Sequence, residues 1–459
     1  MSLEIEKKFL LKPFNIKNFL KKYKIPYKKI KIKQIYLAKN PPIRIRKYGK
    51  KYILTTKKGS GLIRKEYEKN INKKEFLQYL KNYKKIGELK KIRYIFKIKN
   101  FTYELDIFKK DLKGLFFLEV EFKNKKSANK FRIDKRFKDF LIEDVTENRE
   151  FSNFSLAKNK KIPSKNCNNI LEVELIDPLC STKDSLKTLF HSFNRNIIYY
   201  QKKFLEDNDP EHIHKIRVNL RKTRVFLKEY KKYLNEEENK NFSSFFKNFM
   251  QKSNKKRDID VLKENFFKYK ISIPKDLKKY LENLLLEETN KIKNLLKSDE
   301  FEKLKEIYSN MQKESFYNQN SNVPIIISSY NIIEKKISKI FDITKKLNQN
   351  SPADEFHKLR IEFKKFRYLL EAFSHFYNIK EIENLIKKTK NIQDILGSLQ
   401  DIETGIKLLN EIANTAFQNE NKIIEDITIR LEDEKIINKK LFFKKYKNLK
   451  KYLKNSIIF

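Results

Sequence analysis

Hydrophobic and polar positions follow two different periods along the chain. Up to about residue 157 apolar and polar residues mostly alternate, which is typical of strands, whereas from about residue 180 onward apolar residues recur at helical spacing. The alternating half predicts eight strands, near 2–11, 28–38, 42–48, 51–58, 62–70, 89–99, 101–109 and 115–123. Helical patterns interrupt these strands at 12–23, 72–83 and about 127–140.

This change of period predicts an α+β protein of two domains. We place a β-rich domain with flanking helices at residues 1–160 and an all-α domain at residues 179–459. The stretch between them, 161–178, contains Pro, Ser and Asn without a clear period, which is typical of a linker. A loop pattern near residue 320 divides the helical domain into two halves, about 179–320 and 321–459.

The charged residues of the predicted strands share one face. In "LEIEKKF", Glu4, Glu6 and Lys8 alternate with apolar residues, so their side chains point to the same side. The sheet could simply have one solvated face. An eight-stranded barrel would instead turn this face inward and bring acidic and basic pairs together. The other residues with this alternation are Arg44, Arg46, Lys57, Arg64, Glu66, Glu68, Lys91, Arg93, Glu119 and Glu121.

Such an interior would combine two kinds of ligand. Carboxylates bind hard divalent cations, and Arg and Lys bind phosphate oxygens. Metal-assisted attack of water on a phosphoanhydride needs both, because the charge that develops on the phosphates must be offset. The strand pattern therefore indicates phosphoanhydride chemistry.

One helical segment occurs twice. "HKIRVNLRKTRVFL" from His214 aligns with "HKLRIEFKKFRYLL" from His357 on both its basic and its apolar positions, which indicates an internal repeat. In each copy a histidine and three basic residues at i, i+3, i+7 and i+10 lie within an arc of roughly 80° beside an apolar stripe. A single histidine on each face makes metal binding a poor interpretation, and anion binding fits better. The basic faces comprise His214, Arg217, Arg221, Lys222 and Arg224, and His357, Arg360, Lys364, Lys365 and Arg367.

The composition agrees with a polyanionic partner. The formal net charge is +46, which is typical of proteins that bind nucleic acid, polyphosphate or anionic membranes. Lysine accounts for most of this charge, and the abundance of Lys, Asn and Ile is what an AT-rich genome produces. Only 15 of the 105 basic residues are arginine. Most of them lie in the strand and helix motifs, where a bidentate contact to phosphate gives a reason for arginine.

Other classes of protein and compartment are disfavoured. Cys167 and Cys180 have no CxxC spacing, so the sequence predicts neither a zinc site nor a disulfide framework. The N-terminus is charged within its first residues, and no uncharged run approaches the length of a membrane span. We therefore expect a cytoplasmic protein without a membrane partner. No recognisable nucleic-acid-binding module is present, so we expect no specific nucleic-acid partner.

The strand motifs resemble the CYTH domain of the triphosphate tunnel metalloenzyme family. The resemblance rests on the ExExK signature at Glu4–Lys8, followed in order by "RIR", "LTTK", "RKEYE", "KIR", "ELDIF", "LEVEF" and the ending "EDVTENREFSNFSLA". It implies an antiparallel tunnel barrel that hydrolyses or cyclises triphosphates with Mg²⁺ or Mn²⁺. It further implies catalytic roles for Glu4, Glu6 and Lys8, metal ligands at Glu4, Glu6, Glu119 and Glu121, further acidic wall groups at Glu66, Glu68 and Asp106, and triphosphate contacts from Lys8, Arg44, Arg46, Lys57, Lys91 and Arg93.

The repeated helices resemble a CHAD domain, the conserved histidine α-helical domain. "KRDIDVL" from Lys256 and "NIQDILGSLQD" from Asn391 add to this resemblance. It implies two pseudo-symmetric helical bundles whose basic helices face a shared groove that binds inorganic polyphosphate. Asp258, Asp260, Asp394 and Asp401 would then orient the basic side chains. One departure is Lys364, which stands where the first repeat has Arg221.

These features together predict a metal-dependent inorganic triphosphatase, similar to bacterial CYTH–CHAD inorganic triphosphatases. The tunnel would hydrolyse inorganic triphosphate or a related short triphosphate. The helical domain would bind inorganic polyphosphate, and polyphosphate granules are the expected place of association. Three alternatives remain at this point: an adenylate cyclase-type enzyme of the same tunnel family, a non-catalytic polyphosphate-binding protein, and nonspecific nucleic-acid binding through charge.

Overall fold

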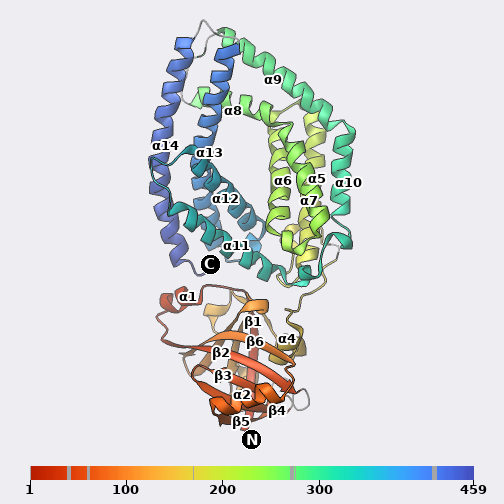
Figure 1. Cartoon of the computed structure of the whole chain (residues 1–459), viewed down its shortest axis with the longest axis vertical. Helices are drawn as coiled ribbons and strands as arrows, with labels where there is room; N and C mark the ends of the chain where they lie inside the picture. Colours follow the sequence, from red (N-terminus) through yellow and green to blue (C-terminus); the bar gives the residue numbers. More distant parts are fainter. Residues whose placement is uncertain are drawn as a thin grey trace.

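The computed structural model describes residues 2–38, 43–58, 63–168, 170–268, 273, 275–415 and 421–459. A lower, β-rich domain and an upper, helical domain follow each other along the long axis of the molecule (Figure 1). Side chains beside some of the gaps are outside this description. Among the residues predicted on the charged strand face these are Lys57, Arg64 and Glu66.

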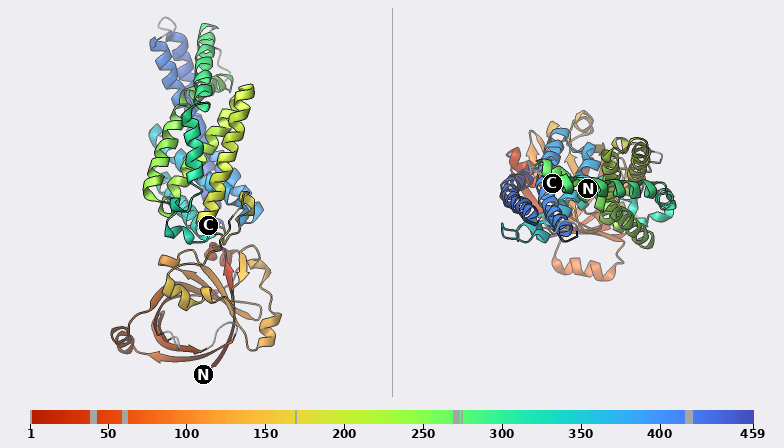
Figure 2. Two further views of the ribbon diagram at one scale, coloured as in Figure 1. Left: turned by 90° about the vertical axis from the view of Figure 1, so that its right-hand side faces the viewer. Right: turned by 90° about the horizontal axis from the view of Figure 1, so that it is seen from above.

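The β-rich domain is one antiparallel sheet that curves round on itself. Its strand order is β5-β4-β3-β2-β6-β7-β8-β1-β9, and the first part of β1 also pairs with β5. Seen from the side, the strands surround a central space (Figure 2, left). The strands are β1 (Ser2–Leu11), β2 (Tyr27–Ala38), β3 (Ile43–Tyr48), β4 (Lys51–Lys58), β5 (Ile63–Ile71), β6 (Gly87–Ile98), β7 (Phe101–Phe108), β8 (Phe116–Glu121) and β9 (Leu141–Asp144).

The alternation of the sequence predicted β1 to β8 to within two residues at each end, and it also predicted α1 (Ile16–Lys22) and α2 (Lys73–Asn82). The helix expected over 127–140 is wrong. The chain there forms α3 (Lys125–Lys130), a 3₁₀ turn and then β9. The side chain of Asp134 accepts hydrogen bonds from the backbone and guanidinium of Arg136 and begins the 3₁₀ turn. Phe131 and Phe137 are buried against the outer face of the sheet, and this packing outweighs helical continuity.

The helical domain consists of two halves that correspond to the sequence repeat. In the first half α5 packs on α6, and in the second half α11 packs on α12. The two repeated helices, α6 and α12, contact each other across the centre of the domain. The helices are α5 (Thr182–Asp207), α6 (Pro210–Glu229), α7 (Glu236–Gln251), α8 (Asn254–Lys268), α9 (Lys275–Leu296), α10 (Asp299–Asn310), α11 (Ile325–Thr344), α12 (Ala353–Ala372), α13 (Ile379–Thr415) and α14 (Asn421–Asn455).

The predicted linker is packed rather than extended. Ile162 and Ile176 are buried in a hydrophobic core that both domains share. Cys167 and Cys180 form a disulfide with their Cα atoms 5.4 Å apart, a bond that the sequence did not predict. Two cysteines with no recognisable spacing motif gave no signal for this bond, because only the fold of the intervening loop brings them together.

The last residues of the chain contact the β-rich domain. The side chain of Asn18 donates to the backbone oxygen of Ser456 at 2.7 Å, and Ile457 is buried in the core between the sheet and α1. Lys113 and Glu334 form an ion pair of 2.8 Å across the same boundary. The two domains are therefore joined through packing as well as through the linker. In the described part of the chain, no helix has the length and apolarity that crossing a membrane requires.

Candidate functional site: a charged tunnel and a basic cavity

The strand register places the predicted tunnel residues on one face of the sheet. Side chains of directly opposed residues in antiparallel strands point to the same side. Lys8 of β1 is opposite Glu119 of β8, and Glu119 is in turn opposite Glu104 of β7. Asp106 of β7 is opposite Arg93 of β6. The same register continues round the sheet: Glu6 with Glu121, Gln34 with Arg46, Arg44 with Thr55, and Thr55 with Glu68.

One wall of the tunnel is a buried network of ion pairs. The guanidinium of Arg93 donates to Asp106 at 2.8 and 2.6 Å and to Glu119 at 2.6 Å. Lys8 pairs with the other oxygen of Glu119 at 2.9 Å, and Lys91 pairs with Asp106. All five residues are buried. The β6–β7–β8–β1 wall therefore holds three cations within reach of one another, neutralised by carboxylates.

This network changes the protonation of its members. Burial lowers the pKa of Lys91 to about 8, with Arg93 acting in the same direction and Asp106 opposing. Burial alone would raise the pKa of Glu119, but the charges of Lys8, Lys91 and Arg93 outweigh it and hold this pKa well below the ordinary value. Glu119 is therefore ionised at neutral pH, whereas Lys91 is close to its titration range.

A second charged group lies on the opposite wall. Glu68 contacts Arg46 at 2.6 Å, Arg44 at 3.7 Å and the hydroxyl of Thr55 at 3.1 Å. Arg44 and Thr55 are buried, whereas Glu68 is 40% exposed and lies nearer to solvent. The structure thus brings Arg44, Arg46 and Glu68 together as the sequence predicted.

Two polar members of this face were not predicted from the sequence. Glu104 contacts Arg93, and it shares its strand parity with Asp106, which is the signal that could have identified it. Gln34 is 1% exposed and donates to the hydroxyl of Tyr36. Its strand reads as a mixture of Lys, Ile and Gln, and only the register with Arg46 shows that it faces the tunnel.

One end of the tunnel is filled by apolar side chains and covered by α4 (Asn153–Asn159). The helix lies in front of the opening in the side view (Figure 2, left). The Tyr36 ring packs against Phe154 of α4, with centroids 5.2 Å apart. A Cβ atom at Gly87 would lie 2.4 Å from the backbone oxygen of Ala157, so glycine is required for this close approach. The inward-facing residues at this end are Leu10, Tyr36, Leu89, Phe108 and Phe117, all buried.

The acidic residues fit a divalent cation that shares its coordination with a substrate. Among the described residues no group of three His, Cys, Asp or Glu side chains is arranged to hold a metal ion by itself. Glu6 and Glu121, however, stand directly opposite each other on β1 and β8. Mg²⁺ usually binds one or two carboxylates and takes its remaining ligands from water and substrate phosphates. This donor set therefore suits magnesium that arrives with a phosphate chain.

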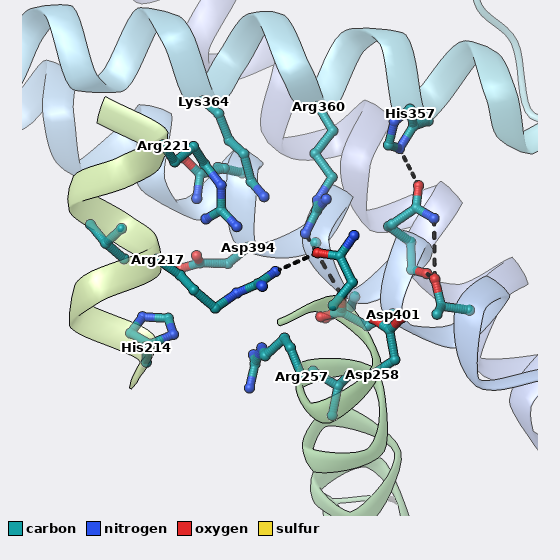
Figure 3. A pocket seen from close by; sticks show the side chains of 18 of the residues that line it. His214, Arg217, Arg221, Arg257, Asp258, His357, Arg360, Lys364, Asp394 and Asp401 are labelled. Atoms are coloured by element: carbon teal, nitrogen blue, oxygen red, sulfur yellow. Dashed lines mark hydrogen bonds and ion pairs between the residues drawn. The ribbon is translucent and has the colours of Figure 1, made fainter. Parts of the chain in front are cut away.

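The helical domain contains a polar cavity of about 640 Å³ between its two halves (Figure 3). Seven of the ten basic residues predicted on the repeated helices line it. Arg257 of α8 also lines the cavity, and the sequence analysis did not assign it to the basic face. The basic lining residues are His214, Arg217, Arg221, Arg257, His357, Arg360, Lys364 and Arg367.

Three predicted residues lie elsewhere. The ammonium of Lys222 is 6.0 Å from the centroids of two aromatic rings, Phe193 and Tyr368. Arg224 contacts the sulfur of Met250, and Lys365 is buried in ion pairs with Glu362 and Glu229. At Lys222 and Lys365 the prediction failed because adjacent residues on a helix point about 100° apart, so a run of basic residues cannot all face one cavity. Arg224 shares the arc of His214, but its guanidinium lies against Met250 instead.

Several cavity cations are held in place by neighbours. Arg217 donates to Asn254 at 3.0 Å and also contacts Ser253, and Arg360 lies 3.7 Å from Asp401. His357 contacts Gln400. Asp258, Asp394 and Asp401 line the cavity, and Asp401 is the one that lies beside a basic side chain of the repeat among the ion pairs described. Asp260 instead pairs with Lys256 outside the lining.

Two basic residues at equivalent positions of the repeat have no counterion among the described residues. Arg221 of α6 and Lys364 of α12 point into the cavity near each other (Figure 3), and neither forms an ion pair or hydrogen bond with the residues that the structure describes. Burial, together with the charges of Arg221 and Arg360, lowers the pKa of Lys364 to about 6. Burial and Arg221 also lower the pKa of Arg217 to about 10. The cavity therefore carries positive charge that its own carboxylates do not balance.

Comparisons with known proteins match both domains. Family models identify a CYTH domain at residues 2–147 and a CHAD domain at residues 189–410. An inorganic triphosphatase of Acetivibrio thermocellus is 31% identical over 169 residues, which are 36% of this chain and 98% of that protein. An inorganic triphosphatase of Nitrosomonas europaea is 32% identical over 158 residues, 34% of this chain and 96% of that protein. The crystal structure of a CHAD domain from the plant Ricinus communis has the same helical fold, with a TM-score of 0.50 and 16% identity over 61% of this chain and 96% of that one.

Proposed function

Since the chain belongs to the CYTH family and carries a CHAD domain after its CYTH domain, we propose that it hydrolyses inorganic triphosphate in the tunnel with the help of a divalent cation. The observation that carries this proposal is that basic and acidic side chains from opposite walls share one inward face of the sheet. The similarity of this domain to two inorganic triphosphatases over nearly their whole length supports the choice of substrate.

The basic residues of both walls would bind the phosphate chain. Arg44 and Arg46 offer planar guanidinium groups for bidentate contacts, and Lys8, Lys91 and Arg93 face them from the other side. In the substrate-free protein these cations pair with Glu68, Glu119 and Asp106. Phosphate oxygens would replace part of these contacts, so the cations are already oriented before substrate arrives.

Glu4, Glu6, Glu119 and Glu121 would hold Mg²⁺ or Mn²⁺ together with the substrate. When bound, the cation would offset phosphate charge and lower the pKa of a coordinated water. The chain's own contribution is positional. Glu119 is fixed by Lys8 and Arg93, so its carboxylate has a defined orientation on the tunnel wall. Lys8 can donate a hydrogen bond to a phosphate oxygen that approaches Glu119.

The covered end of the tunnel favours short substrates. Apolar side chains and α4 fill that end, so a phosphate chain would enter from the other end and could extend only as far as the apolar residues. We expect inorganic triphosphate to be hydrolysed faster than ATP or long polyphosphate. Measuring phosphate release from these three substrates with Mg²⁺, Mn²⁺ and neither cation tests the proposal. Cyclic AMP formation from ATP without triphosphate hydrolysis would favour the cyclase alternative instead.

We further propose that the cavity of the helical domain binds inorganic polyphosphate. The arrangement that supports this is the pair Arg221 and Lys364 on the two repeated helices, a guanidinium and a titratable amine that have no counterion among the described residues. A polyanion lying between the helices would contact both, and linked contacts reinforce each other. Replacing either residue by alanine should then lower affinity for long polyphosphate by roughly tenfold or more.

The control for this experiment removes the same kind of charge elsewhere. Lys231 and Lys240 are exposed and outside the cavity, and replacing both by alanine lowers the net charge by two. At equal salt this variant should bind nearly as the wild type does, because one local pair contributes little to the field of a chain with charge +46. Equal losses in cavity and control variants would mean that binding reflects overall charge only.

A further inference from the structure

Lys364 combines three properties that are rarely found together in one lysine. It lines the polar cavity, its Nζ forms no ion pair or hydrogen bond with the described residues, and the cavity around it holds more arginines than carboxylates. The other acidic or basic residues that line the cavity are His214, Arg217 and Arg221 on α6, Arg257 and Asp258 on α8, His357, Arg360 and Arg367 on α12, and Asp394 and Asp401 on α13.

We propose that Lys364 is a site of covalent acylation by small acyl phosphates. Such a reagent carries a dianionic phosphate beside an electrophilic carbonyl carbon. The surrounding guanidinium groups would hold the phosphate, which places the carbonyl carbon next to the lysine amine. Nζ forms a bond to this carbon, the bond from carbon to the phosphate oxygen breaks, inorganic phosphate leaves with the electron pair, and the amine proton passes to water.

The environment of Lys364 also provides the reactive form of the amine. Only a neutral amine is nucleophilic, and the lowered pKa of Lys364 makes it mostly neutral at pH 7.5, whereas an ordinary surface lysine is almost entirely protonated. The weaker intrinsic nucleophilicity of a less basic amine cancels part of this advantage. The remaining advantage adds to the binding of the reagent's phosphate in the cavity. We therefore expect Lys364 to be acylated roughly tenfold faster than exposed lysines.

Two other lysines on the repeated helices provide an internal comparison. Lys365 is adjacent in sequence but is buried in ion pairs with Glu362 and Glu229, and Lys222 lies beside aromatic rings outside the cavity. Neither has both the cavity position and the absence of a counterion. Selective reaction at Lys364 would thus follow from the cavity and not from the lysine-rich composition.

Acylation would remove the amine that titrates and place an amide in the cavity. The acylated protein would no longer gain a charge at this position when a polyanion binds. Polyphosphate affinity would then respond to the supply of acyl phosphate. This consequence rests on the proposed polyphosphate binding, whereas the acylation itself does not.

The test is incubation of the full-length protein with acetyl phosphate at pH 7.5, followed by peptide mass spectrometry that measures the acetylation rate at each lysine. We expect Lys364 to react fastest, and saturating inorganic phosphate or polyphosphate to slow it. A rate at Lys364 no higher than that of exposed lysines such as Lys231 would overturn the proposal. The polyphosphate affinity of the unmodified protein is measured separately. That measurement tests the polyphosphate proposal alone, so a failure of the acylation proposal can be told apart from it.

A second reagent separates guidance by the phosphate from amine reactivity alone. N-acetoxysuccinimide acetylates amines but carries no phosphate. The variant Arg221→Gln should lower the rate of Lys364 with acetyl phosphate by more than it lowers the rate with N-acetoxysuccinimide. Equal effects on both reagents would show that the cavity does not bind the phosphate group, which would overturn the proposed mechanism.

Discussion

Binding of polyphosphate should be coupled to uptake of a proton by Lys364. With a pKa of about 6 this lysine is roughly 3% protonated at pH 7.5 in the free protein. A phosphate chain lying beside it supplies the missing counterion and raises the pKa toward the ordinary value near 10.4. If the bound pKa exceeds about 9, each binding event takes up roughly 0.9 proton.

Affinity should therefore fall as pH rises. The unbound protein favours the neutral amine of Lys364, and the complex favours its ammonium form. The logarithm of the association constant for polyphosphate therefore falls as pH rises, with a slope equal in magnitude to the number of protons taken up. Between pH 7 and pH 8.5 the slope should be about −1 per pH unit, which is roughly a thirtyfold loss of affinity over that interval. The pKa of His214 is also lowered by burial, and this residue can contribute a smaller share of the uptake near its own pKa.

Isothermal titration calorimetry measures this uptake directly. Long polyphosphate is titrated into the protein at pH 7.5 in buffers with different ionisation enthalpies, and the slope of observed enthalpy against ionisation enthalpy gives the number of protons. Long chains are needed because only their terminal groups titrate near neutral pH. The variant Lys364→Met should still bind but should lose most of the slope. A wild-type slope near zero, or the same slope in wild type and variant, would refute this reasoning.

Three further outcomes follow from other contacts. Gly87→Ala should displace α4, because its Cβ would lie 2.4 Å from a backbone oxygen, and should lower stability in chemical denaturation by about 1–3 kcal/mol. Ile457→Ala should lower the free energy of unfolding by about 2–4 kcal/mol, because the Ile457 side chain is buried in the core between the sheet and α1. An unchanged denaturation midpoint would contradict packing of the C-terminus against the β-rich domain. Lys336, Lys339 and Lys365 hold the pKa of Glu362 at about 2 against the effect of burial. The ionised Glu362 carboxylate should therefore stabilise the folded protein by about 3 kcal/mol above pH 4.5, and this contribution should be lost as pH falls toward 2. Glu362→Gln should flatten this pH dependence of the free energy of unfolding in acid denaturation.

The sequence predicted most of the tunnel because alternation is a local signal. Each strand with alternating charge shows which residues share a face, and antiparallel pairing then brings those faces together. Glu104 was missed although it has the same parity as Asp106. Gln34 was missed because its role depends on a neighbour in another strand, Arg46, and not on its own segment.

The helical cavity could be predicted only in part, for a geometric reason. The repeat identified both basic helices, but consecutive basic residues on a helix diverge, so Lys222 and Lys365 turned out to serve packing and ion pairs. Arg257 comes from a third helix, and its place in the lining follows from how α8 packs against α13. The disulfide and the packed linker depend on the same kind of long-range arrangement, which leaves no periodic trace in the sequence.

In the proposed function, carboxylates of the tunnel hold a divalent cation that assists hydrolysis of triphosphate. The most direct measurement is phosphate release from inorganic triphosphate by the variant Glu6→Gln, which keeps the shape of the side chain and removes its charge. Glu383→Gln, an exposed residue of α13, is the matched control. We predict a loss of at least about a hundredfold in Glu6→Gln at saturating Mg²⁺ or Mn²⁺, with normal rates in the control and unchanged folding in both. Wild-type turnover in Glu6→Gln would contradict the account.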